Sequence, residues 1–219
     1  TYQRHYAPQF IQSRQLIRGG MLGDVKNFYV YMAQDYGPAR GNTWRADPKQ
    51  SGGGQINDSG SHYQDILLWM TDLLPVSVEG YIDPYYHELT TQIELSNGAL
   101  GRLIIIGDYI GGFSDDVRIK GSKGMLRING FTGEVSTVME GTKEPKNIEC
   151  KAPEGWPNDP SDNFVQLLTG RTEENRVPAI FGAKVALLTD MLLTAAKTGK
   201  KVTADEILAD TAYSLDDLK

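Results

Sequence analysis

ELTTQIELSNGALGRLIIIGD, residues 88–108, contains the pattern that decides the fold. Apolar and polar residues alternate on both sides of Asn97-Gly98. Alternation with a period of two predicts β-strands, and an Asn-Gly pair between two such runs predicts a hairpin with a type I′ turn. We therefore expect two antiparallel strands that are joined at Asn97-Gly98.

Strands and helices are predicted outward from this hairpin by the same reasoning. Further alternating segments rich in β-branched and aromatic residues predict strands at 25–34, 76–82, 116–130 and 133–139. Apolar residues at helical spacing predict helices at 7–20, 61–74, 159–170 and 179–200, with Asp159 or Ser161 capping the third. This order predicts an α+β domain over residues 1–219, with an open, mainly antiparallel sheet of about six or more strands and helices on one face.

Residues 103–106, Leu-Ile-Ile-Ile, are apolar at both parities of a strand. One interpretation is that the open face of the sheet forms a subunit interface. The other is a central strand that is buried on both sides within the domain. The sequence leaves both interpretations open.

Composition excludes several classes of protein. A net charge of −6 argues against nucleic acid and anionic membranes as partners, because both would require a clustered basic surface. The single cysteine, Cys150, excludes an internal disulfide framework. The apolar segment 179–196 is interrupted by Gly182, Lys184 and Asp190, so we expect a core helix and no membrane span.

TWRADPKQSGGGQINDSGSHYQD, residues 43–65, holds the candidate catalytic residues. Asp58 and His62 are four positions apart across a predicted junction between loop and helix, so a carboxylate can approach an imidazole and orient it as a general base. The alternative is structural, with Asp58 capping the helix and His62 half-buried. Adding Asp65 gives nitrogen and oxygen ligands, but the spacing supplies no fourth one, and we predict no metal site.

Several other glycines, aromatic residues and a histidine give less specific predictions about binding sites. The triplet Gly52–Gly54 predicts a tight turn, because the chain contains neither a G-x-G-x-x-G nor a P-loop motif that would bind a dinucleotide or phosphate. The segment 107–116 is either a loop that reaches over the substrate with Phe113 at its tip or a plain strand connection. Trp156 either covers a cleft or anchors packing, and His87 is expected at a surface or interface.

The segment 43–65 resembles the substrate-domain signature of the glucose–fructose oxidoreductase, inositol dehydrogenase and rhizopine-catabolism (Gfo/Idh/MocA) family. The signature has the form W-R, G-G-G and D-x-G-x-H-x-x-D, and the matching residues are Trp44, Arg45, Gly52, Gly53, Gly54, Asp58, Gly60, His62 and Asp65. The resemblance extends over essentially the whole chain, including VRIKGSKGMLRING at 117–130. It implies a C-terminal domain like that of glyceraldehyde-3-phosphate dehydrogenase, whose sheet commonly forms the oligomer interface.

The resemblance also implies a function. In such an enzyme His62 takes the hydroxyl proton of the substrate while hydride passes to NAD or NADP, and Asp58 orients His62 or binds a substrate hydroxyl. Arg4, Trp44, Arg45 and Asp65 are then expected to contact the substrate, a sugar, polyol or related hydroxy compound. His5 stands where many relatives have a second arginine, which weakens the assignment of Arg4.

Two features of the family are missing from this sequence, namely its E-K-P motif and its dinucleotide fingerprint. We therefore expect an N-terminal Rossmann domain upstream of Thr1 and no activity from this chain alone. The expected full-length protein is an NAD(P)-dependent dehydrogenase that forms a homodimer or tetramer in the cytoplasm, with an upstream export signal as the alternative location. An NAD-dependent glycosidase of the same architecture and a non-catalytic sugar-binding or assembly domain are the alternative functions.

Overall fold

A computed structural model describes residues 2–83 and 88–219, so His87 lies outside the described residues. Its described strands form one sheet in the order β8-β7-β6-β5-β1-β4-β3-β2-β9. The strands are β1 (Val25–Asp35), β2 (Pro75–Ile82), β3 (Glu88–Leu95), β4 (Leu100–Ile106), β5 (Asp108–Gly121), β6 (Gly124–Ile128), β7 (Val135–Met139), β8 (Lys146–Ile148) and β9 (Val202–Thr203). Among the described pairs only β1 and β4 run parallel, which confirms the mainly antiparallel prediction.

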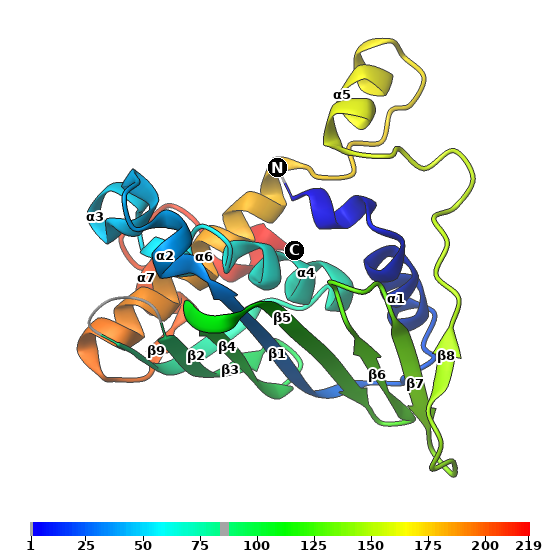
Figure 1. Ribbon diagram of the computed structural model, residues 1–219, viewed down its shortest axis with the longest axis horizontal. Coiled ribbons are helices and arrows are strands. Elements are labelled where there is room, and N and C mark those ends of the chain that lie inside the picture. Colours follow the sequence, from blue (N-terminus) through cyan, green and yellow to red (C-terminus); the bar gives the residue numbers. More distant parts are fainter. Residues whose placement is uncertain (1, 84–87) are drawn as a thin grey trace.

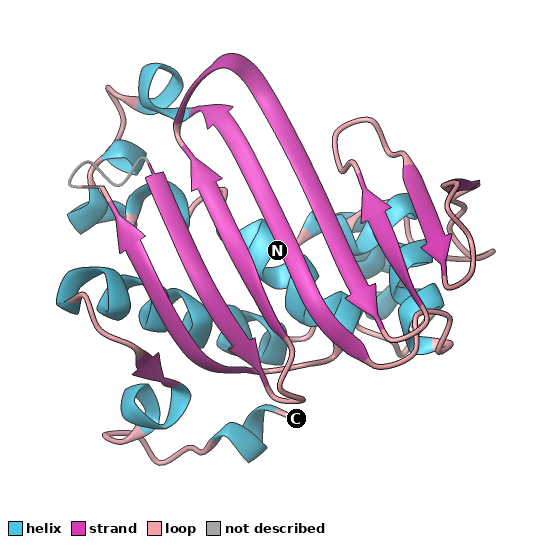
Figure 2. Ribbon diagram, turned by 90° about the horizontal axis from the view of Figure 1, so that it is seen from below, coloured by secondary structure: helices cyan, strands magenta, loops and turns pink. Residues whose placement is uncertain are grey.

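The longer helices lie on one face of the sheet, and the other face is open (Figures 1 and 2). The helices are α1 (Pro8–Arg18), α2 (Tyr36–Arg40), α3 (Pro48–Ser51), α4 (Ser61–Thr71), α5 (Pro160–Leu168), α6 (Ala179–Thr198) and α7 (Ala204–Leu208). Short 3-10 turns are η1 (Gln3–Tyr6), η2 (Trp44–Ala46), η3 (Gly54–Ile56) and η4 (Leu215–Leu218). The Asp159 side chain caps α5 by accepting a hydrogen bond from the Asp162 N–H. Asp159 is one of the two capping residues that the sequence predicted.

The core lies between the sheet and the helices. Leu103 and Ile105 of β4 are buried beneath the helical layer, whereas the alternate residues Ile104 and Ile106 are half-buried on the open face. Because β4 lies between β1 and β3, neighbouring strands shield its open-face side chains in part. This placement accounts for the apolar residues at both parities.

Helix α6 is the one described helix that is long and apolar enough to cross a membrane by length and composition. It packs against β2 and α4, and Leu188, Met191 and Leu192 are completely buried. These contacts are those of the predicted core helix, since its most apolar side covers the sheet.

The turn after β3 differs in type from the prediction. Leu95 donates a backbone hydrogen bond to Ala99 O (2.9 Å), so the hairpin is confirmed. Gly98 has a positive φ of 79°, but Asn97 has not, so the type I′ assignment was wrong. The Asn97 side chain instead accepts a hydrogen bond from the Ala99 N–H (3.0 Å), which stabilises a wider turn.

Strand β5 also begins earlier than the sequence indicated. Residues 108–116 belong to this strand and not to a loop over the substrate, so that interpretation was wrong. Asp108 and residues 113–116 pair with β1, whereas residues 109–112 have no register partner in it. The Phe113 ring contacts Phe131, with centroids 5.6 Å apart, and therefore packs against the neighbouring hairpin. Gly111 and Gly112 lie in the stretch without register partners, which is why the sequence suggested a loop.

Candidate functional site

The start of helix α4 and the loop before it form the candidate site. Gly60 allows this loop to pack closely on the sheet, because a Cβ there would lie 2.5 Å from Ile105 Cδ1 and 2.6 Å from Ile56 O. Gly60 is also the N-cap residue, and no side chain caps the helix. The alternative in which Asp58 caps α4 was therefore wrong, and its carboxylate is available for other contacts.

The glycine triplet forms the tight turn that the sequence predicted. Gly52, Gly53 and Gly54 have φ values of 71°, 133° and 60°, a conformation that disfavours residues with a side chain. The Gly53 N–H donates to Pro48 O (3.0 Å) and the Gly54 N–H to Ser51 Oγ (2.8 Å). These donors are used within the loop, so the turn does not fit the pyrophosphate of a dinucleotide.

Asp58 is held at the surface by two neighbours. Tyr36 donates its hydroxyl hydrogen bond to Asp58 Oδ2 (3.1 Å), and Arg45 Nε lies 3.3 Å from the same oxygen. The Asp58 side chain is 33% exposed, so a ligand can still reach the carboxylate. Burial, and then the nearby Asp58 charge, raise the pKa of Tyr36, which keeps this phenol protonated as a donor.

His62 lies in the first turn of α4 and is half-buried, with its ring edge against Tyr2 (centroids 5.9 Å apart). Burial lowers the pKa of His62 to about 4; the Arg4 charge also lowers it, and Asp58 opposes the shift. The imidazole is therefore neutral at pH 7 and able to accept a proton. Its buried Nδ1 has no hydrogen-bond partner among the described residues.

Arg4 lies close to His62 and is fixed by an aromatic ring. Its guanidinium carbon is 4.4 Å from the centroid of the Tyr63 ring. The Tyr63 hydroxyl in turn donates to Asp115 Oδ2 (2.6 Å), which anchors the ring to β5. A cation held in this way repels a proton on His62, consistent with the lowered pKa.

Asp65 occupies a different environment from Asp58. Its side chain is 0% exposed, and its Oδ1 lies 3.0 Å from His5 Nε2. The ring of His5 stacks on Trp69 at 4.0 Å, and its Nδ1 contacts Arg176 O at 3.0 Å. Asp65 thus contacts buried protein groups, where a substrate does not reach it in this structure.

The structure brings together most of the predicted site residues. Asp58, His62, Arg4, Arg45 and Trp44 flank one region; the Trp44 side chain is 54% exposed, with the Arg45 guanidinium 4.7 Å from its ring centroid. The residues that sequence reasoning missed are Tyr2, Tyr36 and Tyr63. Only Tyr36, a polar aromatic residue directly after a strand, gave a signal.

A neutral imidazole beside an accessible carboxylate can bind a hydroxyl group and remove its proton. The positive end of α4 further disfavours the imidazolium and so supports the neutral form. An accessible arginine and an exposed indole ring suit the polar groups and the apolar face of a sugar.

Comparisons with known proteins identify the family and the fold. A family model described as the GFO/IDH/MocA C-terminal domain matches residues 10–127. Glucose-fructose oxidoreductase domain-containing protein 1 of Xenopus tropicalis is 24% identical over 141 residues, which cover 58% of this chain and 36% of that protein.

Solved structures share the fold. Levoglucosan dehydrogenase in complex with NADH and levoglucosan superposes with a TM-score of 0.77 at 17% identity, over 93% of this chain and 64% of the other. Aldose-aldose oxidoreductase from Caulobacter crescentus, complexed with glycerol, gives 0.78 at 20% identity, over 92% and 62%. The chain thus spans about a third of the curated relative and under two thirds of each structure.

Proposed function

This chain belongs to the GFO/IDH/MocA family, and from that premise we propose that it is the substrate-binding half of an NAD(P)-dependent dehydrogenase of sugars, polyols or related hydroxy compounds. The single observation that carries the proposal is the half-buried His62 in the first turn of α4, where the charge of the accessible Asp58 reaches it. The levoglucosan dehydrogenase and aldose-aldose oxidoreductase structures, similar in fold, support the substrate class.

In the proposed reaction His62 accepts the proton of the substrate hydroxyl that is oxidised. Asp58, which Tyr36 and Arg45 hold in place, binds a neighbouring substrate hydroxyl and fixes the distance to His62. Arg4 keeps the imidazole neutral before the transfer. Trp44 and Arg45 cover the sugar from the loop side. A nicotinamide, when bound, supplies the hydride acceptor.

The glycine turn of this chain uses its N–H groups internally and does not fit the dinucleotide, so the proposal assigns cofactor binding to an upstream Rossmann domain. The surface beside η1 suits such a domain. Helix α5 projects from the body of the molecule (Figure 1) and exposes Phe164 (62%) and Leu168 (71%). A cavity lined by Gln3, Tyr6 and α5 residues lies between them, next to the first described residues.

Turnover by the full-length protein tests this function. We expect NAD(P)-dependent oxidation of at least one member of a panel of aldoses, polyols and anhydrosugars, and none by the 219-residue chain alone. Asp58→Asn should raise KM about tenfold or more, because an amide binds a hydroxyl less strongly than a carboxylate does. Asp210→Asn, the same change at an exposed carboxylate near the C-terminus, is the matched control. Reduced nicotinamide is followed by absorbance.

Absence of oxidation across the panel, with NAD and NADP both bound, would contradict the dehydrogenase assignment. Release of an aglycone from a glycoside without net reduction of the cofactor would favour the glycosidase alternative.

We also propose that the open face of the sheet mediates self-association. Tyr31 of β1 and Ile104 of β4 are register partners, and both are half-buried on this face. A stable dimer buries roughly 800 Å² per partner. Ile104→Glu should therefore lower the sedimentation coefficient to that of a monomer at micromolar concentration, whereas Tyr213→Glu, at an exposed residue near the C-terminus, should not. A monomeric wild-type protein would contradict the proposal.

A further inference from the structure

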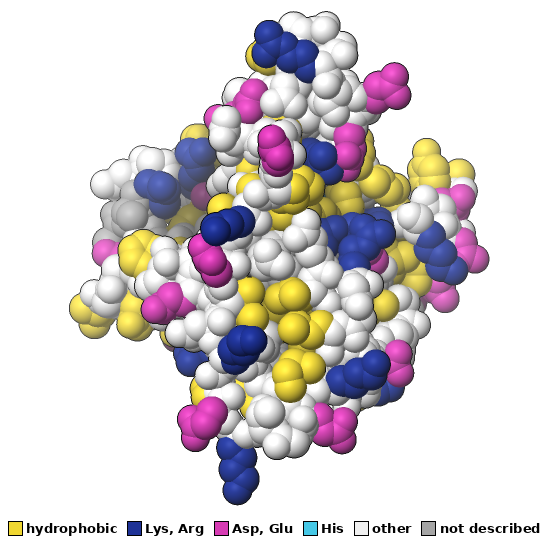
Figure 3. All heavy atoms as spheres, turned by 90° about the vertical axis from the view of Figure 1, so that its right-hand side faces the viewer, with side chains coloured by type: hydrophobic (Ala, Val, Ile, Leu, Met, Phe, Trp, Pro, Cys, Tyr) yellow, Lys and Arg dark blue, Asp and Glu magenta, His cyan; other side chains and the backbone are white. Residues whose placement is uncertain are grey.

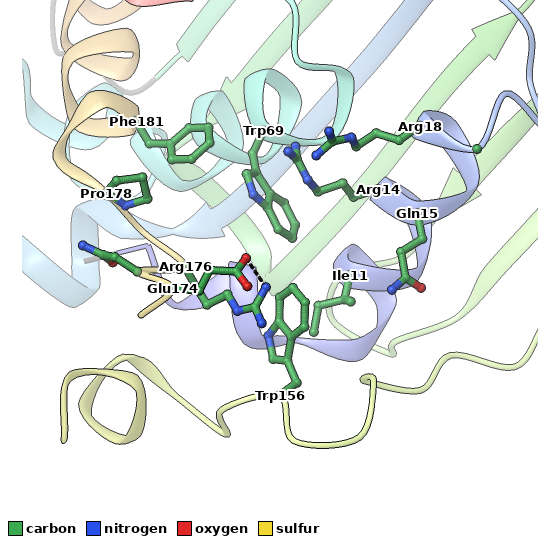
Figure 4. A pocket seen from close by; sticks show the side chains of 12 residues that line it. Ile11, Arg14, Gln15, Arg18, Trp69, Trp156, Glu174, Arg176, Pro178 and Phe181 are labelled. Atoms are coloured by element: carbon green, nitrogen blue, oxygen red, sulfur yellow. Dashed lines mark hydrogen bonds and ion pairs between the residues drawn. The ribbon is translucent and has the colours of Figure 1, made fainter. Parts of the chain in front are cut away.

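A cavity of about 530 Å³ lies away from the candidate catalytic residues, between α1, α4, the start of α6 and the segments on either side of α5. Figure 4 shows Trp69 and Trp156 on opposite sides of this space, with Arg176 and Ile11 also bordering it. From the corresponding side of the molecule, hydrophobic side chains border Lys and Arg side chains beneath the projecting α5 segment (Figure 3). Its volume suits a small organic ligand.

Three buried N–H donors that belong to cavity residues have no acceptor among the described residues. They are Arg14 Nη1, Arg176 Nε and Trp156 Nε1. They come from α1, from the segment before α6 and from the segment before α5, so only the tertiary fold brings them together. Each of these atoms has less than 1 Å² of accessible area, whereas the Arg14 and Arg176 side chains are 15% and 21% exposed. A ligand in the cavity therefore meets the outer N–H groups of these two guanidinium groups.

The charges around the cavity also favour an anion. Arg14, Arg18 and Arg176 line it, and Lys184 lies close enough to Arg14 for their charges to interact. Two carboxylates form ion pairs with these groups among the described residues: Asp72 pairs with Arg14 (2.9 Å) and with Arg18 (3.2 Å), and Glu174 pairs with Arg176. Cationic groups therefore exceed carboxylates in this cluster, and an oxyanion would compensate the excess.

The remaining walls are rigid and apolar. The Arg176 guanidinium stacks on Trp156 (3.8 Å), and that of Arg14 stacks on Trp69 (4.8 Å), so both cations are held in place. Ile11, Pro178 and Phe181 contribute apolar surface to the same cavity. A ligand with a charged end and a carbon skeleton would match both the donors and these walls.

We infer that this cavity is a second ligand site, which binds a small organic molecule through a carboxylate or phosphate group. The oxyanion accepts hydrogen bonds from the outer N–H groups of Arg14 and Arg176, and the skeleton packs on Ile11 and Phe181. The site is separate from the proposed catalytic residues, so its test does not depend on turnover.

Binding is measured by calorimetry on the 219-residue chain and on the full-length protein, with D-gluconate, D-glucose 6-phosphate, inorganic phosphate and uncharged D-glucose as probes. Tryptophan fluorescence provides a second signal, because two of the three tryptophans line the cavity. We expect gluconate or glucose 6-phosphate to bind with a sub-millimolar Kd and D-glucose not to bind. The preferred anion distinguishes carboxylate from phosphate.

Arg14→Gln and Arg176→Gln each remove one of the charges that hold the oxyanion. Each should weaken binding about tenfold or more, the usual effect of losing a hydrogen bond to a charged group. Arg127→Gln, on the open face of the sheet, is the matched control and should bind as the wild type does. Circular dichroism verifies that each variant is folded.

Three results would overturn the assignment. They are equal binding of charged and uncharged sugars, unchanged affinity in both cavity variants, and binding to this chain that disappears in the full-length protein. The last would indicate that an acidic side chain of the upstream region occupies the cavity.

Discussion

His62→Ala in the full-length protein is expected to lower kcat by about a hundredfold or more and to leave nicotinamide binding unchanged. The variant removes the group that we propose as the general base, and losses of this size are usual when such a group is deleted. The cofactor is assigned to the upstream domain, so its Kd should not move. Steady-state kinetics and cofactor titration measure the two effects separately.

The pH dependence has a definite sign. A base acts only in its unprotonated form, and the pKa of His62 is lowered to about 4, mainly by burial and then by Arg4. The neutral form of His62 therefore predominates at pH 7 and at lower pH until the pH nears that pKa. We expect kcat/KM to fall only when the pH approaches about 4. Arg4→Gln removes a nearby positive charge, so it should move this acidic limb toward higher pH.

Chemical rescue separates catalysis from structure. Added imidazole should restore part of the turnover of His62→Ala, because the half-buried ring leaves a space that imidazole fits. The melting temperature should change little, since His62 Nδ1 makes no hydrogen bond with the described residues. Near-normal turnover in this variant, or a loss of activity that follows from unfolding, would refute the role of His62.

Asp65→Ala is expected to reduce the free energy of unfolding by about 3–5 kcal/mol, because it breaks a buried pair and leaves His5 Nε2 without a partner. Both side chains are 0% exposed, with His5 Nε2 within 2.9–3.0 Å of the carboxylate oxygens. The carbonyl of Arg176 only accepts, so His5 Nδ1 must carry a proton there. Burial raises the pKa of the Asp65 carboxyl, and its hydrogen bond with His5 opposes that shift.

Urea unfolding measures this effect. Asp58→Ala is a matched control within the same motif, because its carboxylate is one-third exposed; its cost should stay below about 1 kcal/mol. Comparable stabilities for the two variants would contradict the different roles that we assign to the two aspartates. A stability loss of this size is a large share of the roughly 5–15 kcal/mol that is typical of whole proteins.

The fold was predictable because its signals are local. Alternation along residues 25–34 and 88–106, and helical spacing at 61–74, reflect which face of each element is buried. The secondary-structure predictions were wrong where pairing between strands overrides the local sequence signals. The glycines of 107–116 suggested a loop, yet residues 113–116 are held as a strand by their pairing with β1.

The candidate site was predictable in its residue types but only in part in its contacts. The sequence D-x-G-x-H-x-x-D in 58–65 indicated a carboxylate and a base at the start of a helix. It gave no indication that Asp58 would bind Tyr36 and Arg45. The motif includes Gly60 but does not explain why a glycine is needed there. The reason is its close approach to β4, which only the structure shows.

By itself, then, the sequence determined the order of helices and strands and the mainly antiparallel sheet. It also identified Asp58 and His62 as candidate catalytic groups. These features were predictable because periodicity, turn residues and short motifs act between near neighbours. Tertiary structure alone decided that Asp65 belongs to the core with His5, 60 residues away, and that donors from Arg14, Trp156 and Arg176 surround one cavity. Such contacts depend on how the elements pack. Packing is set by the shape and burial of the whole domain, which no local pattern encodes.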